Sequence, residues 1–291
     1  MPLFSGLQGG AVTRGLLAHS SFKVKAVTRD PNKPSSKALE KLGAEVVKGD
    51  LDDRAVVESI LKGSYGAFFV TNFFDHFSKE KEVKQGKMLA DISKELGLKH
   101  VIFSGVENVN KITGGKLEVL HFDGKGEVEE YFWEQKVPMT SVRIAAYYEN
   151  FLSTWKPVKA IDGNYYVLAI PMGDVPLDGI SVADIGPAIA NILDHPSEYI
   201  GKWVGLSAEA LTIEQYASVL SKHMGKTVKD AKITMEAYEK LGFPGAEELA
   251  NMFRFNLTRP QRDVSLTHKL IPNVRTFDKF IADNKEAFKH L

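Results

Sequence analysis

Residues 66–71 read Gly-Ala-Phe-Phe-Val-Thr, a continuous apolar run that is typical of a strand buried on both faces. Further strand-like runs lie on either side of it, at residues 22–28, 44–47, 100–104 and 139–145. Helix-like stretches separate these runs, at residues 53–61, 79–96 and 118–133. Strands that alternate with helices of this length predict a parallel sheet with helices on both faces, which is a Rossmann-type doubly wound α/β fold.

After residue 150 the pattern changes to short helical stretches that are linked by irregular, proline-containing segments. We therefore predict two units, a Rossmann domain at residues 1–150 and a smaller, mainly helical lobe at residues 151–291. In folds of this kind a second lobe usually closes over the carboxyl edge of the sheet, where ligands bind.

The composition excludes several classes of site. The chain has 291 residues with 37 basic and 37 acidic side chains, and this balance gives no indication of a nucleic-acid-binding surface. It has no cysteine, which excludes disulfides and thiolate chemistry. The histidines are scattered, and no His-Glu-x-x-His motif or carboxylate cluster occurs, so we predict no metal site.

The sequence also gives an expected location in the cell. No apolar stretch approaches the roughly 20 residues that are needed to cross a bilayer. Residues 1–6 lack the basic segment followed by an apolar segment that marks a secretory signal. We expect a cytoplasmic protein and leave the nucleus open as a second location.

Residues 5–10 read Ser-Gly-Leu-Gln-Gly-Gly and precede a helix with apolar periodicity. A glycine turn that opens a helix, here with Gly6, Gln8 and Gly9, can place backbone N–H groups against a phosphate. Alone this signal is weak, because glycines often start helices. The signal becomes stronger because a strand and a residue suited to bind phosphate follow the glycine turn.

That residue is Arg29, which ends the second predicted strand about 20 residues after the glycines. NAD-type sites keep an acidic residue at this point for the ribose 2′-OH, whereas NADP-type sites place an arginine for the 2′-phosphate. Thr28 adds a hydroxyl donor and Lys33 a second positive charge. The alternative is a solvated basic loop, but the βαβ context favours NADP(H) as the cofactor.

Polar residues also end other predicted strands. Asp50 ends the third strand, and Thr71 and Asn72 end the fourth. All three fall on the ligand edge, where Asp50 would accept from an adenine amino group and the other two would line the ribose or nicotinamide. Turn chemistry explains each of them equally well, because Asp and Asn favour loops. Tyr147 and Tyr148 follow the sixth strand, where they would wrap the nicotinamide end or serve as interface aromatics.

Short-chain dehydrogenases carry a serine at the end of the fifth strand and a Tyr-x-x-x-Lys pair on the next helix. The tyrosine transfers a proton, while the lysine lowers the pKa of the tyrosine and holds the ribose. Here Ser104 and Lys125 occupy two of these positions, but the tyrosine position is His121. The pattern favours cofactor binding without the usual proton transfer, although histidine is a competent acid or base. The alternative is a surface histidine and lysine on a helix.

Taken together, these segments resemble the NmrA-like family of atypical short-chain dehydrogenases over essentially the whole chain. The strings that carry the resemblance are residues 8–10 (Gln-Gly-Gly), 26–29 (Ala-Val-Thr-Arg), 82–87 (Glu-Val-Lys-Gln-Gly-Lys), 121–132 (beginning His-Phe-Asp-Gly-Lys), 137–143, 173–176, 240–246 and 249–255.

The resemblance implies a protein that binds NADP(H), lacks ordinary dehydrogenase activity and responds to the balance between NADPH and NADP. It also implies a homodimer in cofactor-dependent equilibrium with the monomer, and binding to other proteins, including argininosuccinate synthase. The cofactor contacts expected from the motifs and the resemblance are Gly6, Gln8, Gly9, Thr28, Arg29, Lys33, Asp50, Leu51, Thr71, Asn72, Phe73, Lys84, Lys125, Tyr147, Tyr148, Glu149 and Asn150.

The start of the chain departs from the family pattern. The family opens with a full apolar strand and a Gly-Gly-x-Gly turn, whereas only residues 1–5 precede Gly6 here. A strand normally has about five or six residues, and Pro2 lacks an N–H for pairing. We therefore expect a truncated first strand in an N-terminally shortened form, with weaker cofactor binding than a full-length form.

Three hypotheses about function remain open. The first is an NADP(H)-binding redox sensor that controls partner proteins without being an enzyme. The second is an NADPH-dependent reductase of the isoflavone-reductase or quinone-reductase type, which would use Lys125 with His121 or Ser104. The third is an interaction module that does not bind the cofactor.

Overall fold

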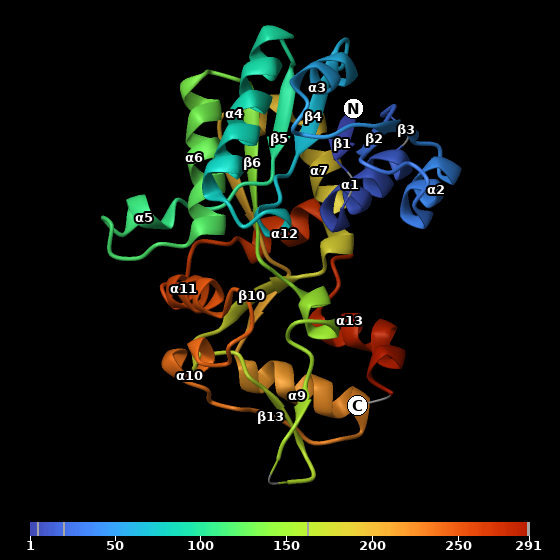
Figure 1. The fold of residues 1–291 in the computed structure, drawn as a ribbon. Coiled ribbons are helices and arrows are strands. Elements are labelled where there is room, and N and C mark those ends of the chain that lie inside the picture. Colours follow the sequence, from blue (N-terminus) through green and yellow to red (C-terminus); the bar gives the residue numbers. More distant parts are fainter. Residues whose placement is uncertain (5, 20, 162, 290–291) are drawn as a thin grey trace.

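The computed structural model describes residues 1–4, 6–19, 21–161 and 163–289, and within them seven parallel strands form one main sheet. The strand order is β11-β6-β5-β4-β1-β2-β3 (Figure 1). The strands are β1 (Pro2–Phe4), β2 (Lys25–Thr28), β3 (Glu45–Lys48), β4 (Gly66–Phe69), β5 (His100–Phe103), β6 (Met139–Ile144) and β11 (Trp203–Leu206). The chain order reverses direction between β1 and β4, as in a doubly wound sheet. The predicted Rossmann-type fold is confirmed.

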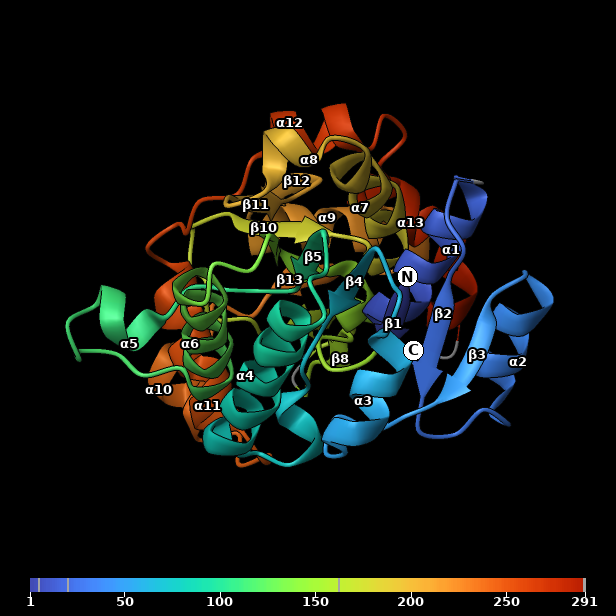
Figure 2. The same ribbon diagram turned by 90° about the horizontal axis from the view of Figure 1, so that it is seen from above.

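Helices cover both faces of the main sheet. In the view from above, α3, α4 and α6 lie on one face, and α1, α7 and α12 lie on the other (Figure 2). The helices around the sheet are α1 (Leu7–Ala18), α2 (Pro34–Lys41), α3 (Arg54–Leu61), α4 (Lys79–Glu95), α5 (Val109–Ile112), α6 (Leu120–Glu134), α7 (Ile185–Asp194), α8 (Pro196–Tyr199) and α12 (Val264–Leu270), with 3-10 turns η1 (Phe73–Asp75) and η3 (Val182–Asp184). Among the described residues, no helix is both long enough and apolar enough to cross a membrane.

The short first strand occupies the centre of the main sheet. β1 has three residues, and it pairs with β2 and with β4. In the register, Leu3 lies opposite Ala26 on one side and Phe68 on the other. The Lys25 N–H donates to the Met1 carbonyl at 2.9 Å, which continues the ladder beyond Pro2. A short strand therefore still connects the two halves of the sheet.

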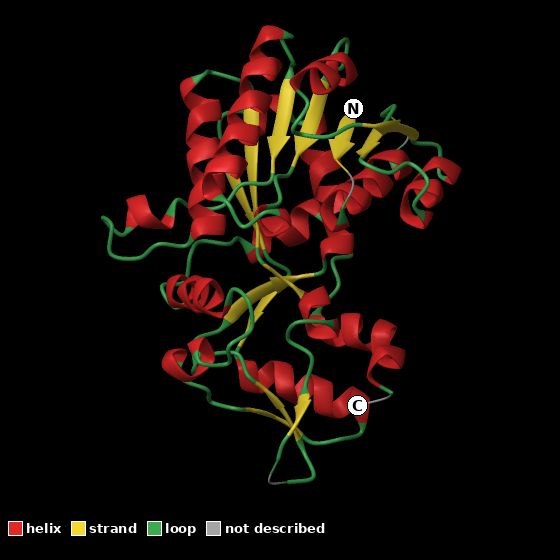
Figure 3. Cartoon of the chain, viewed as in Figure 1, coloured by secondary structure: helices red, strands yellow, loops and turns green. Residues whose placement is uncertain are grey.

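The second lobe contains small sheets as well as helices (Figure 3). In the described part of the chain, β7, β10 and β12 form one three-stranded sheet and β8, β9 and β13 form another. These strands are β7 (Ala146–Tyr147), β8 (Val158–Lys159), β9 (Tyr166–Leu168), β10 (Leu177–Ile180), β12 (Glu209–Leu211) and β13 (Val228–Asp230). The helices are α9 (Ile213–Met224), α10 (Met235–Glu239), α11 (Ala246–Asn256) and α13 (Phe277–Asn284), with 3-10 turns η2 (Tyr148–Leu152) and η4 (Lys285–Phe288). Strands this short show no alternation in sequence, and the prediction of a mainly helical lobe did not include them.

Residues 151–291, which were predicted to form the lobe alone, also complete the main sheet. Strand β11 adds to its edge by pairing with β6 over four residues, from Trp203 opposite Ser141 to Leu206 opposite Ile144. Helices α7 and α12 pack on the same side of the sheet as α1 (Figure 2). The chain therefore passes between the sheet and the lobe more than once.

Helices α1 and α7 pack closely against each other at two glycines. A Cβ atom on Gly15 would lie 2.4 Å from the Gly186 carbonyl carbon, and one on Gly186 would lie 2.6 Å from the Ala11 carbonyl oxygen. Both distances are far shorter than a van der Waals contact. The two glycines therefore allow the helix backbones to approach, while the neighbouring Val12 and Leu16 are fully buried.

We predict that Gly186→Ala destabilises the protein, because its new methyl group meets backbone atoms that cannot rotate away. The expected loss is about 1–3 kcal/mol of unfolding free energy, as for other overpacked sites. Urea unfolding measures it. Gly10→Ala in α1, the helix that packs against α7, is the control: its Cβ would meet only the flexible Arg14 side chain, at 3.5 Å. Equal stability of Gly186→Ala and the wild type would contradict the account of the helix contact.

Candidate functional site

The first turn of α1 begins at the carboxyl edge of the main sheet. Gly6 precedes it in an extended conformation, and no side chain caps the helix. A Cβ atom at Gly6 would meet nothing within 4 Å, so this helix end is open. The N–H groups of a first helical turn have no partner within the helix, and they attract phosphate groups. Gly9, in contrast, is buried behind the turn.

Gln8 joins this turn to the second lobe. Its side-chain amide donates a hydrogen bond to the Tyr147 hydroxyl, which belongs to β7. The other side-chain atom, Gln8 Oε1, is buried and has no partner among the described residues. Burial raises the pKa of Tyr147 to about 12, so this phenol stays protonated at neutral pH. The predicted residues Gln8 and Tyr147 are thus brought together by the fold.

The residues after β2 form a short basic segment. Arg29 Nη2 lies 3.0 Å from Asp75 Oδ2, and the arginine side chain is 64% exposed. The Thr28 hydroxyl accepts a hydrogen bond from the Asp30 N–H at 3.2 Å, so its first role is to shape the turn. Lys33 is exposed and precedes α2. Asp75, which was not predicted, is therefore the direct partner of the predicted phosphate residue.

A hollow of about 250 Å³ lies beside Arg29. Its walls are formed by Arg29, Lys48, Gly49, Asp50, Asp53 and Val56. Asp50 is exposed and accepts a hydrogen bond from the Asp52 N–H at 3.1 Å, and Leu51 is half-buried. The fold thus brings Arg29 and Asp50 to one hollow, although they follow different strands.

The residues after β4 lie at the same edge of the sheet. Thr71 is 2% exposed, and its hydroxyl has no partner among the described residues. Asn72 is exposed and precedes η1, whereas Phe73 is buried. The centroid of the Phe73 ring lies 6.0 Å from that of His121, so this segment packs directly against the start of α6.

Lys125 is held by a carboxylate inside the fold. It forms an ion pair with Glu82 of α4, whose side chain is fully buried. The second oxygen, Glu82 Oε2, is buried without a partner among the described residues. Ser104 is 4% exposed at the end of β5, and Lys84 lies on the exposed side of α4. The positive charge of Lys125 is therefore already neutralised by a residue that the sequence analysis did not single out.

His121 is clamped by a carboxylate from the second lobe. Glu248 of α11 accepts hydrogen bonds from the His121 backbone N–H at 2.9 Å and pairs with the ring Nδ1. The His121 ring also packs against Phe74 and Phe122, with centroid distances of 5.2 and 4.7 Å. Burial alone would raise the pKa of Glu248, but the hydrogen bonds from His121 hold it below its usual value.

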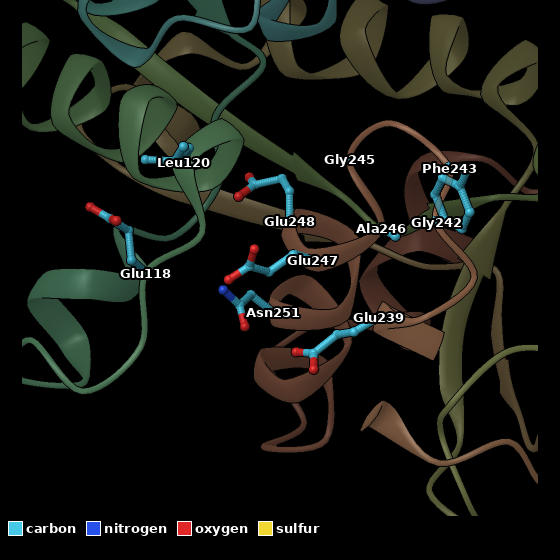
Figure 4. Close-up of a pocket in the computed structure, with 10 residues that line it drawn as sticks. All are labelled: Glu118, Leu120, Glu239, Gly242, Phe243, Gly245, Ala246, Glu247, Glu248 and Asn251. Atoms are coloured by element: carbon cyan, nitrogen blue, oxygen red, sulfur yellow. The ribbon is translucent and has the colours of Figure 1, made fainter. Parts of the chain in front are cut away.

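A second hollow adjoins this clamp. It has a volume of about 510 Å³ and lies between the start of α6 and the α10–α11 segment (Figure 4). Four carboxylates are among the residues that line it, namely Glu118, Glu239, Glu247 and Glu248. Two of them have cationic or histidine partners, because Glu239 pairs with Arg254 at 2.6 Å and Glu248 pairs with His121.

The residues after β7 have structural contacts. Tyr148 is fully buried, and its hydroxyl donates to Glu209 at 3.0 Å. Glu149 accepts hydrogen bonds from the Ser181 hydroxyl at 2.7 Å and from the Val182 N–H at 3.0 Å. Asn150 is half-buried, and its backbone carbonyl accepts from residues 153 and 155. Of the four predicted residues 147–150, Tyr147 forms a hydrogen bond with Gln8 in the first turn of α1.

A buried ionic network fixes the loop after β5. Arg262 donates to both oxygens of Glu107, at 2.6 and 3.1 Å. Arg143 of β6 pairs with Glu129 of α6, and the Ser141 hydroxyl donates to the same carboxylate. Burial raises the pKa of Glu129 although Arg143 opposes this, whereas the arginines hold the pKa of Glu107 below its usual value against the effect of burial. The network ties the end of β5, which carries Ser104, to the segment before α12.

Among the described residues, no group of three or more histidine, aspartate or glutamate side chains has the arrangement of a metal site. Part of the predicted set lies at the carboxyl edge of the main sheet. It comprises the open start of α1, the basic segment after β2, and the buried oxygens Gln8 Oε1 and Thr71 Oγ1, which have no partner among the described residues. The carboxylates that pair with predicted residues, Asp75, Glu82 and Glu248, were missed. No motif spacing marks them, because each reaches its partner only through the tertiary fold.

Comparisons with known proteins agree with the fold. The sequence model of the NmrA-like family matches residues 4–281. An NmrA-like family domain-containing protein of Dictyostelium discoideum is 33% identical over 244 residues, which span 81% of this chain and 80% of the relative. The NmrA-like family domain-containing oxidoreductase FrzB of Cladobotryum sp is 30% identical over 280 residues, or 87% and 82% of the two chains. The crystal structure of NmrA, a negative transcriptional regulator, in complex with NADP has a TM-score of 0.83 at 20% identity, and the match covers 97% of this chain and 94% of that chain.

We predict that the His121–Glu248 clamp makes the stability of the protein depend on pH. The pKa of Glu248 in the folded state lies below its ordinary value of 4.5. Its contribution is therefore complete above that value and is lost as the pH falls through the folded-state pKa. Glu248→Gln should cost about 1.5–3 kcal/mol near neutral pH, since hydrogen bonds to charged groups contribute this much.

Urea unfolding of the wild type and Glu248→Gln between pH 6 and pH 3.5 measures this difference. It should shrink as the solution becomes more acidic. Glu247→Gln is the matched control, because Glu247 is the exposed neighbour on the same helix turn. A stability difference that is constant over this pH range would contradict the role of the Glu248 charge.

Proposed function

This chain belongs to the NmrA-like family, and from that premise we propose that it is a regulatory protein that binds NADP(H) without ordinary dehydrogenase activity. The observation that carries the proposal is the state of the two residues that a dehydrogenase would use. Lys125 is neutralised by buried Glu82, and His121, at the usual tyrosine position, is held by Glu248. A nicotinamide ring supplies a hydride when it is bound, but reduction also needs a proton donor, and Lys125 and His121 are each engaged in an internal pair.

The polar atoms at the ligand edge support a dinucleotide. Gln8 Oε1 and Thr71 Oγ1 are buried without a partner among the described residues. Since buried polar atoms in proteins normally form hydrogen bonds, these two atoms are suited to a polar ligand. Gly6 would leave room for the pyrophosphate at the start of α1, and Arg29 would take the 2′-phosphate.

The regulatory part of the proposal rests on relatives and on the link between the lobes. NmrA is described as a negative transcriptional regulator, and its crystal structure holds NADP. In this chain, Gln8 and His121 both contact the second lobe, through Tyr147 and Glu248. Cofactor binding at Gln8 or His121 would therefore alter contacts with the second lobe. We include in the proposal a cofactor-dependent homodimer and a protein partner, for which the resemblance suggests argininosuccinate synthase.

We predict that NADP⁺ and NADPH bind the wild type more tightly than NAD⁺ does, and that Arg29→Ala removes this preference. The loss of affinity for NADP⁺ should be about ten- to a hundredfold, because hydrogen bonds to charged groups are worth about 1.5–3 kcal/mol. Isothermal titration calorimetry of the folded protein measures each affinity.

Lys279→Ala is the matched control, since Lys279 on α13 is 62% exposed, nearly as exposed as Arg29 at 64%. Its dinucleotide affinities should equal those of the wild type. A folded wild type that binds neither phosphorylated nor unphosphorylated dinucleotide would overturn the proposal and leave the interaction module as the better account.

A reductase is the second candidate, and the names of several relatives favour it, FrzB among them. We predict that the wild type does not oxidise NADPH in the presence of a small quinone at a rate above that without protein. The reason is that Glu82 neutralises Lys125. Loss of NADPH absorbance over time measures the rate. Steady turnover by the wild type that disappears in Lys125→Ala would establish the reductase instead.

A further inference from the structure

Arg29 forms an ion pair with a carboxylate of the same chain. Its guanidinium lies 3.0 Å from the Asp75 carboxylate, and the two side chains are 64% and 42% exposed. Arg29 follows β2 and Asp75 ends η1 after β4, whereas β1 lies between these two strands in the sheet. The ion pair therefore connects the loops on either side of β1, whose end leads to Gly6 and the open start of α1.

The segment that carries Asp75 is anchored. Phe73 at its start is 2% exposed. The Phe77 N–H at its end donates to the Phe73 carbonyl at 2.7 Å, and Phe77 has a φ of 52°, a left-handed conformation that phenylalanine rarely adopts. The rings of Phe73 and Phe77 pack edge to face at 5.8 Å. Asp75 is thus carried by a turn whose backbone is closed by a hydrogen bond and anchored by a buried ring.

The charges around the hollow beside Arg29 determine how the Arg29–Asp75 pair would affect the binding of an anion. Arg29 and Lys48 are the cations that line the hollow, and Asp50 and Asp53 are its anions. When Asp75 pairs with Arg29, the carboxylates around the hollow outnumber the cations. A phosphate group carries up to two negative charges, so the carboxylates around the hollow repel it unless the Arg29–Asp75 ion pair breaks. A ribose 2′-OH is neutral, and it can donate to a carboxylate.

We propose that Asp75 is an internal competitor for the 2′-phosphate and sets the preference between phosphorylated and unphosphorylated dinucleotides. The inference rests on the proposed binding of NADP(H). Binding of the 2′-phosphate exchanges the Arg29–Asp75 ion pair for an Arg29–phosphate pair, and the cost of breaking the first pair lowers the affinity for NADP(H). NAD(H) has no phosphate at this position, so it binds with the internal pair intact.

The test is calorimetric titration of Asp75→Asn with NADP⁺ and with NAD⁺. This variant removes the competing charge with little change in size. The affinity for NADP⁺ should rise about three- to fivefold, in line with the small contribution of exposed ion pairs, and the affinity for NAD⁺ should not rise. Asp75→Glu keeps the charge and should retain the affinities of the wild type.

Asp278→Asn is the matched control, because Asp278 forms a similarly exposed pair with Lys222 at 2.6 Å on the second lobe. It should change neither affinity. If the wild type binds NADP⁺ but Asp75→Asn binds it no more tightly, the competitor role is overturned and the proposed function stands. If the wild type binds neither dinucleotide, both proposals fall.

Discussion

Helices α1 and α7 approach each other at Gly15 and Gly186 until no Cβ atom fits between their backbones. Helix α1 begins with the turn that contains Gly6 and Gln8, while α7 lies between the lobe strand β10 and the sheet strand β11. This contact fixes the ligand edge relative to the segment that returns from the lobe to the sheet. Backbone atoms cannot change rotamer to relieve a clash, so the arrangement depends on two residues that lack a side chain.

Three nitrogen-bearing side chains near the ligand edge each pair with a carboxylate from another element of the fold. Arg29 has Asp75, Lys125 has Glu82, and His121 has Glu248. The Lys125–Glu82 pair in addition leaves no buried charge uncompensated. An anionic ligand that contacts Arg29 or Lys125 therefore meets a cation that already has a partner. The free energy of binding then depends on the difference between the ion pairs formed with the ligand and the internal ion pairs that they replace. Breaking an internal pair also changes the contacts of the helix or turn that supplied its carboxylate.

The sequence predicted the main sheet because its strands, such as Gly66–Phe69 and His100–Phe103, are buried on both faces and separated by periodic helices. The two-residue strands of the lobe have too few positions to show any period. In the candidate site, topology alone brings residues at strand ends, such as Arg29 and Thr71, to one edge. Their carboxylate partners could not be predicted, because they depend on how helices pack. The separation of 127 positions between His121 and Glu248 illustrates this.

The repeated passage of the chain between sheet and lobe limits how this architecture can be divided. The chain leaves the main sheet after β6, returns with α7 and β11, leaves again, returns with α12 and enters the lobe once more with α13. A fragment that ended at residue 150 would leave β6 as an open edge and would uncover Val12 and Leu16, which are fully buried in the whole chain. A chimera that joined this sheet to another lobe at a single point in the sequence would therefore not keep both parts intact. Exchanging the lobe would require several junctions, and each would have to preserve the contacts of α1 with α7 and of β6 with β11.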